Sequence, residues 1–170
     1  MAIERLQRTR SLFSLYVIGL ASVAGSAAAA ERLSQTQARA VVTPFYEALS
    51  AVPDNEVATL VKQATAHVWT SCGGNDECKS RDEAISAIAG LHKLVPDLRW
   101  EIRDLLVAGN QVIVRGEATG TPSGDFSGVP YGGRSFKVMS IDVHTIEGGK
   151  MVHSYHVEDW RGATRQLSAR

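Results

Sequence analysis

Polar side chains in two neighbouring predicted strands are the strongest chemical signal in this sequence. Residues 137–146 and 151–160 alternate in the manner of strands, and a tight Glu-Gly-Gly-Lys turn joins them. Asp142, His144 and His156 fall within these strands. Ionisable groups in a half-buried sheet destabilise it unless they are paired or used. We therefore look for a functional site in this hairpin.

Asp142 and His156 form a candidate acid–base pair. If Gly149 is left-handed in a three-residue loop, Asp142 lies opposite or diagonal to His156, with roughly 4.5–8 Å between their Cβ atoms. The carboxylate can then fix the histidine tautomer and raise its basicity, which leaves the other ring nitrogen to exchange a proton. Histidine suits this work near neutral pH because its ordinary pKa is about 6.5. His144 is expected to be a polar helper.

Two other interpretations of these residues stay open. Asp142 and His156 can be a buried pair that only stiffens the sheet. Alternatively, Asp142, His144 and His156 can form a metal site of two histidines and one carboxylate. The i, i+2 spacing of the first two plus one ligand from the next strand permits that geometry.

Three helices are predicted before the strands. They run from Ser34 to about Ser50, over 55–65, and from a capping box at 80–83 to about Leu94. Pro44 predicts a kink in the first of them or a helix start nearby.

Strands follow the helices, and the order is typical of an α+β fold. The predicted strands are 98–103, 111–121 and the hairpin, with a Gly- and Pro-rich loop at 121–134 and a short helix over 160–167. A strongly curved antiparallel sheet wrapped around the helices would leave a cone-shaped pocket.

The first thirty residues have the character of a signal peptide. Arg5, Arg8 and Arg10 precede an apolar stretch at 12–24, and three alanines at 28–30 predict cleavage after Ala30. The apolar stretch is short for a membrane span, although a retained N-terminal anchor is the alternative. We expect a periplasmic or secreted protein, with residues 31–170 as one domain and no membrane association after cleavage.

Charge and cysteine content narrow the function classes. Without its leader the chain has 15 basic and 17 acidic side chains and a net charge of −2 with His neutral, so nucleic acid is not an expected partner. Cys72 and Cys78 are the only cysteines and flank a Gly-rich loop. After export such a pair is predicted to form a disulfide, whereas in a reducing cytosol the two would be unrelated thiols.

Four short blocks, in their order and spacing, resemble a known family. They are VPDLRWEI at 95–102, GTP with GDFSGVP at 120–130, GK at 149–150 and RQL at 165–167. Together, over about 38–167, the chain resembles the SnoaL-like polyketide cyclases of the nuclear transport factor 2-like superfamily. The resemblance implies a curved antiparallel sheet that encloses a pocket and is backed by three helices.

The resemblance also implies a chemistry. These cyclases close a ring by aldol chemistry without metal or cofactor, using an aspartate on the last strand and a histidine on the strand before it. Carried over from the Gly-Lys turn, the aspartate position falls on His156 and the histidine position on Asp142, so the two residue types are exchanged. The resemblance also allows a homodimer through the open sheet face.

The sequence thus predicts an exported, cofactor-free cyclase, lyase or isomerase that acts on a small hydrophobic carbonyl compound. A non-catalytic small-molecule-binding domain of the same fold is the alternative. Aromatic residues are expected to bind the ligand, with other apolar side chains completing the wall. The ligand-binding candidates are Phe45, Trp69, Trp100, Phe126 and Tyr131, and the additional wall candidates are Leu91, Val129 and Phe136.

Overall fold

The computed structural model describes residues 33–169, and the predicted signal peptide lies outside them. The elements are α1 (Gln35–Leu49), α2 (Asp54–Ala64), β1 (Thr65–Cys72), β2 (Cys78–Ser80), α3 (Arg81–Leu94), β3 (Arg99–Ala108), β4 (Gln111–Gly120), β5 (Phe136–Glu147), β6 (Lys150–Glu158) and α4 (Trp160–Ser168). None of these helices has the length and apolar character needed to cross a membrane.

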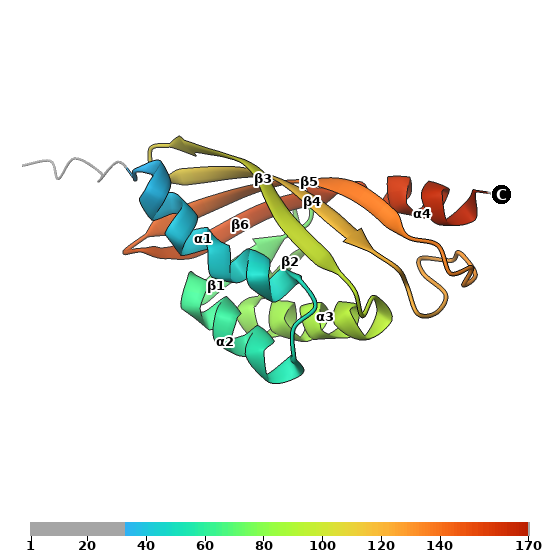
Figure 1. Ribbon diagram of the computed structural model, residues 1–170. Helices are drawn as coiled ribbons and strands as arrows, with labels where there is room; N and C mark the ends of the chain where they lie inside the picture. The colour runs from blue at the N-terminus through green and yellow to red at the C-terminus, as the bar shows by residue number, and fades with distance from the viewer. Residues whose placement is uncertain (1–32, 170) are drawn as a thin grey trace, which may run out of the picture.

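The six strands form one curved, open sheet in the order β2-β1-β6-β5-β4-β3. Every neighbouring pair is antiparallel except β1 and β6, which run parallel. Helices α1, α2 and α3 lie against one face of the sheet, whereas α4 continues from β6 at one end of it (Figure 1). The expected α+β fold with a curved antiparallel sheet is confirmed.

Local signals explain where the helices begin. The side chain of Ser34 caps α1 and that of Ser80 caps α3, each in a reciprocal capping box. Helix α1 runs without interruption through Pro44, so the alternative of a helix start near this proline is wrong. Proline removes one backbone donor, but packing of Val42 and Phe45 into the core favours the continuous helix.

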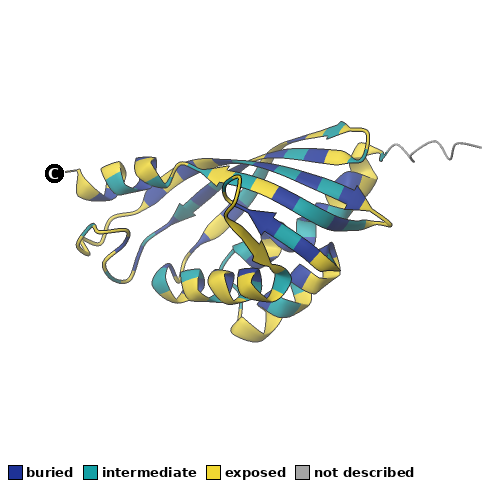
Figure 2. Cartoon of the chain, turned by 180° about the vertical axis from the view of Figure 1, so that it is seen from behind, coloured by how far each residue is buried: buried dark blue, intermediate teal, exposed yellow. Residues whose placement is uncertain are grey.

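The core lies between the helices and the inner face of the sheet. Buried and more exposed residues alternate along the long strands (Figure 2), as expected where one sheet face is covered. On the inner side, α1 residues pack against Trp69 of β1 and His144 of β5, with Phe45 in edge-to-face contact with both rings.

Strands β1 and β2 were not predicted from the sequence, and β1 is the longer of the two. It follows α2 without a loop, and its pattern of buried and exposed residues does not alternate regularly. The predicted disulfide is present between Cys72 of β1 and Cys78 of β2, which are partners across the two strands. It closes the short loop that joins the edge strand to the sheet.

Candidate functional site

The β5–β6 hairpin places the predicted site residues on one face of the sheet. Asp142 lies directly across from His156, and His144 lies directly across from Ser154. Gly149 adopts the left-handed conformation, with φ of 73°, and so does Gly148. Glu147 pairs with Lys150, so the turn has two residues and the expected three-residue loop is wrong. A register shift between Thr145 and Ile146 is what brings Asp142 opposite His156. Because facing residues of an antiparallel pair share a face, all four side chains are directed towards the helices.

A cavity of about 530 Å³, counted out to its open mouth, lies above these residues. Its apolar wall comes mainly from α1 and α3, and its polar floor comes from the sheet. The wall residues are Phe45, Leu49, Trp69, Ala84, Ala87 and Ile88, and the polar residues are Ser71, Lys79, Asp142, His144, Ser154, His156 and Glu158. An apolar enclosure with a few convergent polar groups is typical of a small-molecule site.

Glu158, rather than Asp142, is the hydrogen-bond partner of His156. Nδ1 of His156 donates to Oε1 of Glu158 over 2.7 Å. The side chain of Glu158 is only 14% exposed, and its second oxygen accepts from Nε1 of Trp160 over 3.2 Å. The expectation that Asp142 orients the ring directly is therefore wrong, because the longer Glu158 side chain lies two residues along on the same face of β6.

This contact makes His156 a stronger base than an ordinary histidine. The hydrogen bond to Glu158, followed by the charges of Glu158 and Asp142, raises the pKa of His156, although partial burial opposes the shift. Within residues 33–169, Nε2 of His156 has no hydrogen-bond partner. It lies beside Gly73, where a Cβ atom would stand 3.7 Å from it.

Asp142 is buried beneath the cavity, with 2% of its surface exposed. Burial raises the pKa of Asp142 to about 6, while hydrogen bonding by Ser140 and Tyr46 acts in the opposite direction. The Ser140 hydroxyl donates to Oδ2 of Asp142 over 3.0 Å. A carboxylate with such a pKa can accept a proton near neutral pH.

His144 is fully buried and uses both ring nitrogens. Nε2 lies 3.0 Å from the Tyr46 hydroxyl, and Nδ1 lies 2.8 Å from the Ser154 hydroxyl. Burial lowers the pKa of His144 to about 3, so the ring is neutral under ordinary conditions. A neutral ring that bonds at both ends can organise the site but does not supply a charge.

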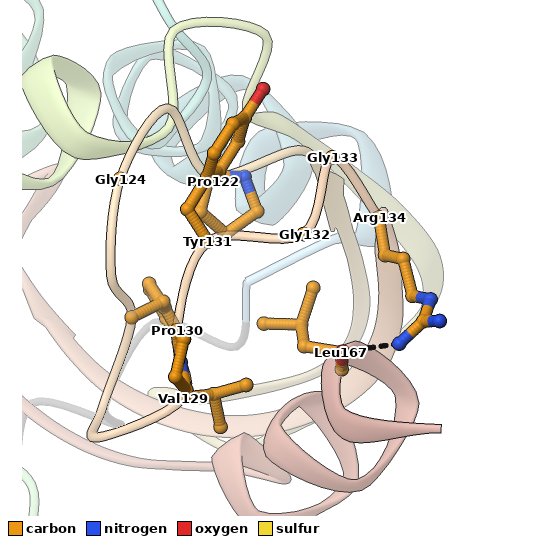
Figure 3. A pocket seen from close by; sticks show the side chains of 10 residues that line it. Pro122, Gly124, Val129, Pro130, Tyr131, Gly132, Gly133, Arg134 and Leu167 are labelled. Carbon is orange, nitrogen blue, oxygen red and sulfur yellow. Dashed lines mark hydrogen bonds between the residues drawn. The ribbon is translucent and has the colours of Figure 1, made fainter. Parts of the chain in front are cut away.

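The predicted ligand-binding aromatics are divided among three places. Phe45 and Trp69 line the cavity. Trp100 lies behind it and donates from Nε1 to the Ser140 hydroxyl over 3.3 Å. Phe126 and Tyr131 instead line a separate hollow of about 210 Å³ in the loop before β5 (Figure 3), where Tyr131 is 59% exposed.

Four further residues of the site were not assigned from sequence. Alternation along the strands could have found Ser140, Ser154 and Glu158, since each lies an even number of residues from Asp142 or His156 on its own strand. Nothing in the sequence placed Tyr46 of α1 beside them. The proposed metal arrangement is not formed, because within residues 33–169 no three His, Cys, Asp or Glu side chains are grouped to hold an ion.

Comparison with known proteins identifies the family of this fold. The sequence profile of the SnoaL-like polyketide cyclases matches residues 40–167. No protein of curated function is significantly similar in sequence.

Solved structures agree with that match. TsrD from Streptomyces laurentii superposes with a TM-score of 0.68 at 24% identity, covering 81% of this chain and 99% of its own. A provisionally assigned SnoaL-like polyketide cyclase from Jannaschia sp. CCS1 gives 0.68 at 21% identity, covering 79% and 94%. A SnoaL-like polyketide cyclase from Agrobacterium tumefaciens C58 gives 0.61 at 17% identity, covering 75% and 94%.

Proposed function

The chain belongs to the SnoaL-like polyketide cyclase family, and we propose that it is an exported, cofactor-independent cyclase, lyase or isomerase of a small hydrophobic carbonyl compound. The observation that carries this proposal is the cross-strand pair Asp142 and His156 on the floor of the cavity. The environment of each residue suits it to acid–base work near neutral pH.

In this proposal Asp142 is the base and His156 is the acid. The Asp142 carboxylate removes a proton from the carbon next to the substrate carbonyl, and the electron pair moves onto the carbonyl oxygen. Protonated His156 donates a hydrogen bond from Nε2 to that oxygen and stabilises its developing charge. His144 stays neutral and holds its neighbours in place.

A ring closes when the enolate carbon attacks a second carbonyl of the same molecule. The new carbon–carbon bond leaves an alkoxide, which takes back the proton held by Asp142, so the enzyme returns to its starting state. If no second carbonyl is within reach, returning the proton to a different carbon of the enolate gives an isomerisation. The apolar wall favours a flat or compact hydrophobic substrate.

Exchange of hydrogen with solvent tests this chemistry without knowledge of the natural substrate. Residues 31–170 would be incubated in D₂O with a panel of aromatic methyl ketones and 1,3-diketones, and loss of the α-proton signal followed by ¹H NMR. We expect accelerated exchange for part of the panel and none above background with Asp142→Asn. Asp104→Asn, an exposed carboxylate of β3, is the matched control and should exchange like the wild type.

A non-catalytic binding domain is the second candidate function. It is favoured by the hydrogen bonding of buried Asp142 to Ser140, which is compatible with a purely structural carboxylate. This function predicts that panel members bind, as shown by ligand-induced shifts in ¹⁵N-HSQC spectra, but exchange no faster than in buffer. Exchange that disappears in Asp142→Asn would rule it out.

Export is proposed from the leader-like N-terminus and from the cysteine pair. A disulfide between Cys72 and Cys78 is stable in an oxidising compartment such as the periplasm or the exterior. Expression of the full chain in a bacterium, followed by fractionation and intact-mass measurement, should give a periplasmic or secreted species that begins at Glu31. A full-length mass in the cytosolic fraction would contradict export.

A homodimer through the outer sheet face is the proposed assembly. Ile141 faces Val157 and Val143 faces Tyr155 across β5 and β6, and the Tyr155 and Val157 side chains are exposed. Light scattering of the wild type and of Val157→Lys should then give a dimer and a monomer, respectively. A monomeric wild type would remove this part of the proposal.

A further inference from the structure

We infer that Trp100 begins a chain of hydrogen bonds that ends on Asp142, and that Trp69 begins a second chain, through Ser154 and His144 to Tyr46, whose hydroxyl proton we assign to Asp142. Both tryptophans are then positioning residues for this carboxylate. The chains also assign the proton of the neutral His144 ring to Nε2. The catalytic consequence rests on the proposed function of Asp142, but the chains can be tested without any substrate.

The first chain is short and its direction is fixed. The indole N–H of Trp100 can only donate, and it donates to the Ser140 hydroxyl over 3.3 Å. The hydroxyl proton of Ser140 is then free to point onward to Oδ2 of Asp142, at 3.0 Å. Trp100 therefore orders a serine whose proton serves the carboxylate.

The second chain begins at Trp69. Its indole N–H donates to the Ser154 hydroxyl over 2.9 Å, and the same oxygen lies 2.8 Å from Nδ1 of His144. Ser154 is buried, and within residues 33–169 its hydroxyl proton has no acceptor other than Nδ1. Leaving that proton unpaired would be unfavourable, so Ser154 donates and Nδ1 accepts.

The donor-to-acceptor direction set by Trp69 and Ser154 then continues through the His144 ring towards Asp142. Because neutral His144 has one ring proton and Nδ1 accepts, Nε2 carries the proton and donates to the Tyr46 oxygen over 3.0 Å. The Tyr46 hydroxyl proton is then not used by His144, and we assign it to Asp142, whose pKa Tyr46 lowers. The opposite direction would leave the Ser154 proton unpaired and turn the Tyr46 proton away from Asp142.

The third tryptophan provides an internal control. The chain contains three tryptophans, and the indole N–H of Trp160 donates to Glu158, the partner of His156. Trp160 thus donates on the histidine side of the site and gives no hydrogen bond to either chain, although its ring packs edge-to-face against that of Trp100. Changing it should leave the His144 proton where it is.

The test is the tautomer of His144, read from ¹⁵N-labelled protein by long-range ¹H–¹⁵N NMR near pH 7. We expect Nε2–H in the wild type and in Trp160→Phe. In Trp69→Phe and in the smaller change Ser154→Ala, His144 should show a mixture of tautomers or a shift to Nδ1–H. If Trp69→Phe fails to fold because the buried indole is lost, Ser154→Ala tests the same chain with a smaller change.

The effect on the carboxylate is measured separately, by ¹³C NMR titration of Asp142. Tyr46→Phe and Ser140→Ala each remove a donor, so each should move the titration midpoint of Asp142 upward. Nδ1–H in the wild type, or an unchanged midpoint in both donor variants, would overturn the inference. If substrate α-protons still exchange with solvent while His144 carries its proton on Nδ1, the hydrogen-bond chains are refuted and the proposed function stands. If His144 carries its proton on Nε2 but no substrate proton exchanges, the proposed function is refuted and the chains stand.

Discussion

Nδ1 of His156 donates to Oε1 of Glu158 over 2.7 Å, although the residue directly across the sheet from His156 is Asp142. The two carboxylates therefore have different tasks. Glu158 holds the ring and favours its charged form, while Asp142 is buried and has a raised pKa. Two carboxyl groups in different environments can act as distinct parts of one acid–base site.

The pH dependence of hydrogen exchange should be bell-shaped. Activity needs Asp142 deprotonated and His156 protonated, so the rate should rise through about pH 6, the pKa of Asp142. It should fall again above the ordinary histidine value of 6.5, because the pKa of His156 is raised. Initial rates measured between pH 4 and pH 10 check both limbs, and a rate that keeps rising at alkaline pH would argue against His156 as the acid.

Asp142→Asn should abolish exchange and should gain stability relative to the wild type as the pH rises. A folded-state carboxyl with a raised pKa contributes stability that is complete below its unfolded value and is lost as the pH rises through about 6. The interval from 3.8 to about 6 corresponds to about 3 kcal/mol. Urea unfolding of both proteins near pH 3 and pH 7 should show the free-energy difference move by nearly that amount in favour of the variant.

Glu158→Gln should weaken the acid function while the fold is kept. A neutral amide removes the charge that holds the proton on His156, so the pKa of the ring should fall and the alkaline limb of the rate profile should move to lower pH. ¹⁵N titration of His156 measures the pKa directly. Glu147→Gln, a change at an exposed glutamate of the hairpin turn, is the matched control, and equal effects of the two changes would contradict the assigned contact.

Gly73→Ala should reduce activity without loss of stability. The added methyl would lie 3.5 Å from Cε1 and 3.7 Å from Nε2 of His156, which is an ordinary contact but covers the nitrogen that would face the substrate. Gly124→Ala, where a methyl meets no atom within 4 Å, is the control. Both variants should unfold at or above the wild-type urea midpoint, since alanine restricts the unfolded chain, and only Gly73→Ala should slow exchange.

Removal of the disulfide should destabilise the protein by ~2 kcal/mol, the loop-closure value for its sequence separation of 6. The double variant Cys72→Ser/Cys78→Ser would be compared with wild type in urea, with and without dithiothreitol. The reductant should lower the wild-type midpoint towards that of the variant and leave the variant unchanged. A variant midpoint equal to that of the oxidised wild type would show that the loop gains no stability from its bridge.

Much of the hairpin could be predicted from sequence because strand alternation and the two glycines mark the strands and their turn. The register also depends on a shift between Thr145 and Ile146, which no residue pattern predicted. The expected loop placed Asp142 opposite or diagonal to His156, and in the structure the two residues are directly opposite. It could not rank two carboxylates that compete for one imidazole, since side-chain length and burial decide that contact. The sequence analysis assigned three aromatic residues outside the cavity to it, namely Trp100, Phe126 and Tyr131. An aromatic residue type does not indicate on which side of a curved sheet its loop or strand end lies.

Strand β1 was missed for a related reason. Strands β2 and β6 pair with its two edges, and its residues are buried in a pattern that does not follow a simple period of two. Its parallel partner, β6, is distant in the chain. No local sequence pattern predicts a pairing between strands so far apart in the chain.

That parallel pairing determines when the site can form during synthesis. Trp69 leaves the ribosome 85 residues before Ser154. Strand β6 must enter between β1 and β5 before the cavity has a floor. A nascent chain that ends before Lys150 has its first three helices and the β3–β4 hairpin but no acid–base pair. Until β6 is synthesised, the edge of β1 that pairs with it has unpaired backbone hydrogen-bonding groups. This edge must be shielded from pairing with neighbouring chains.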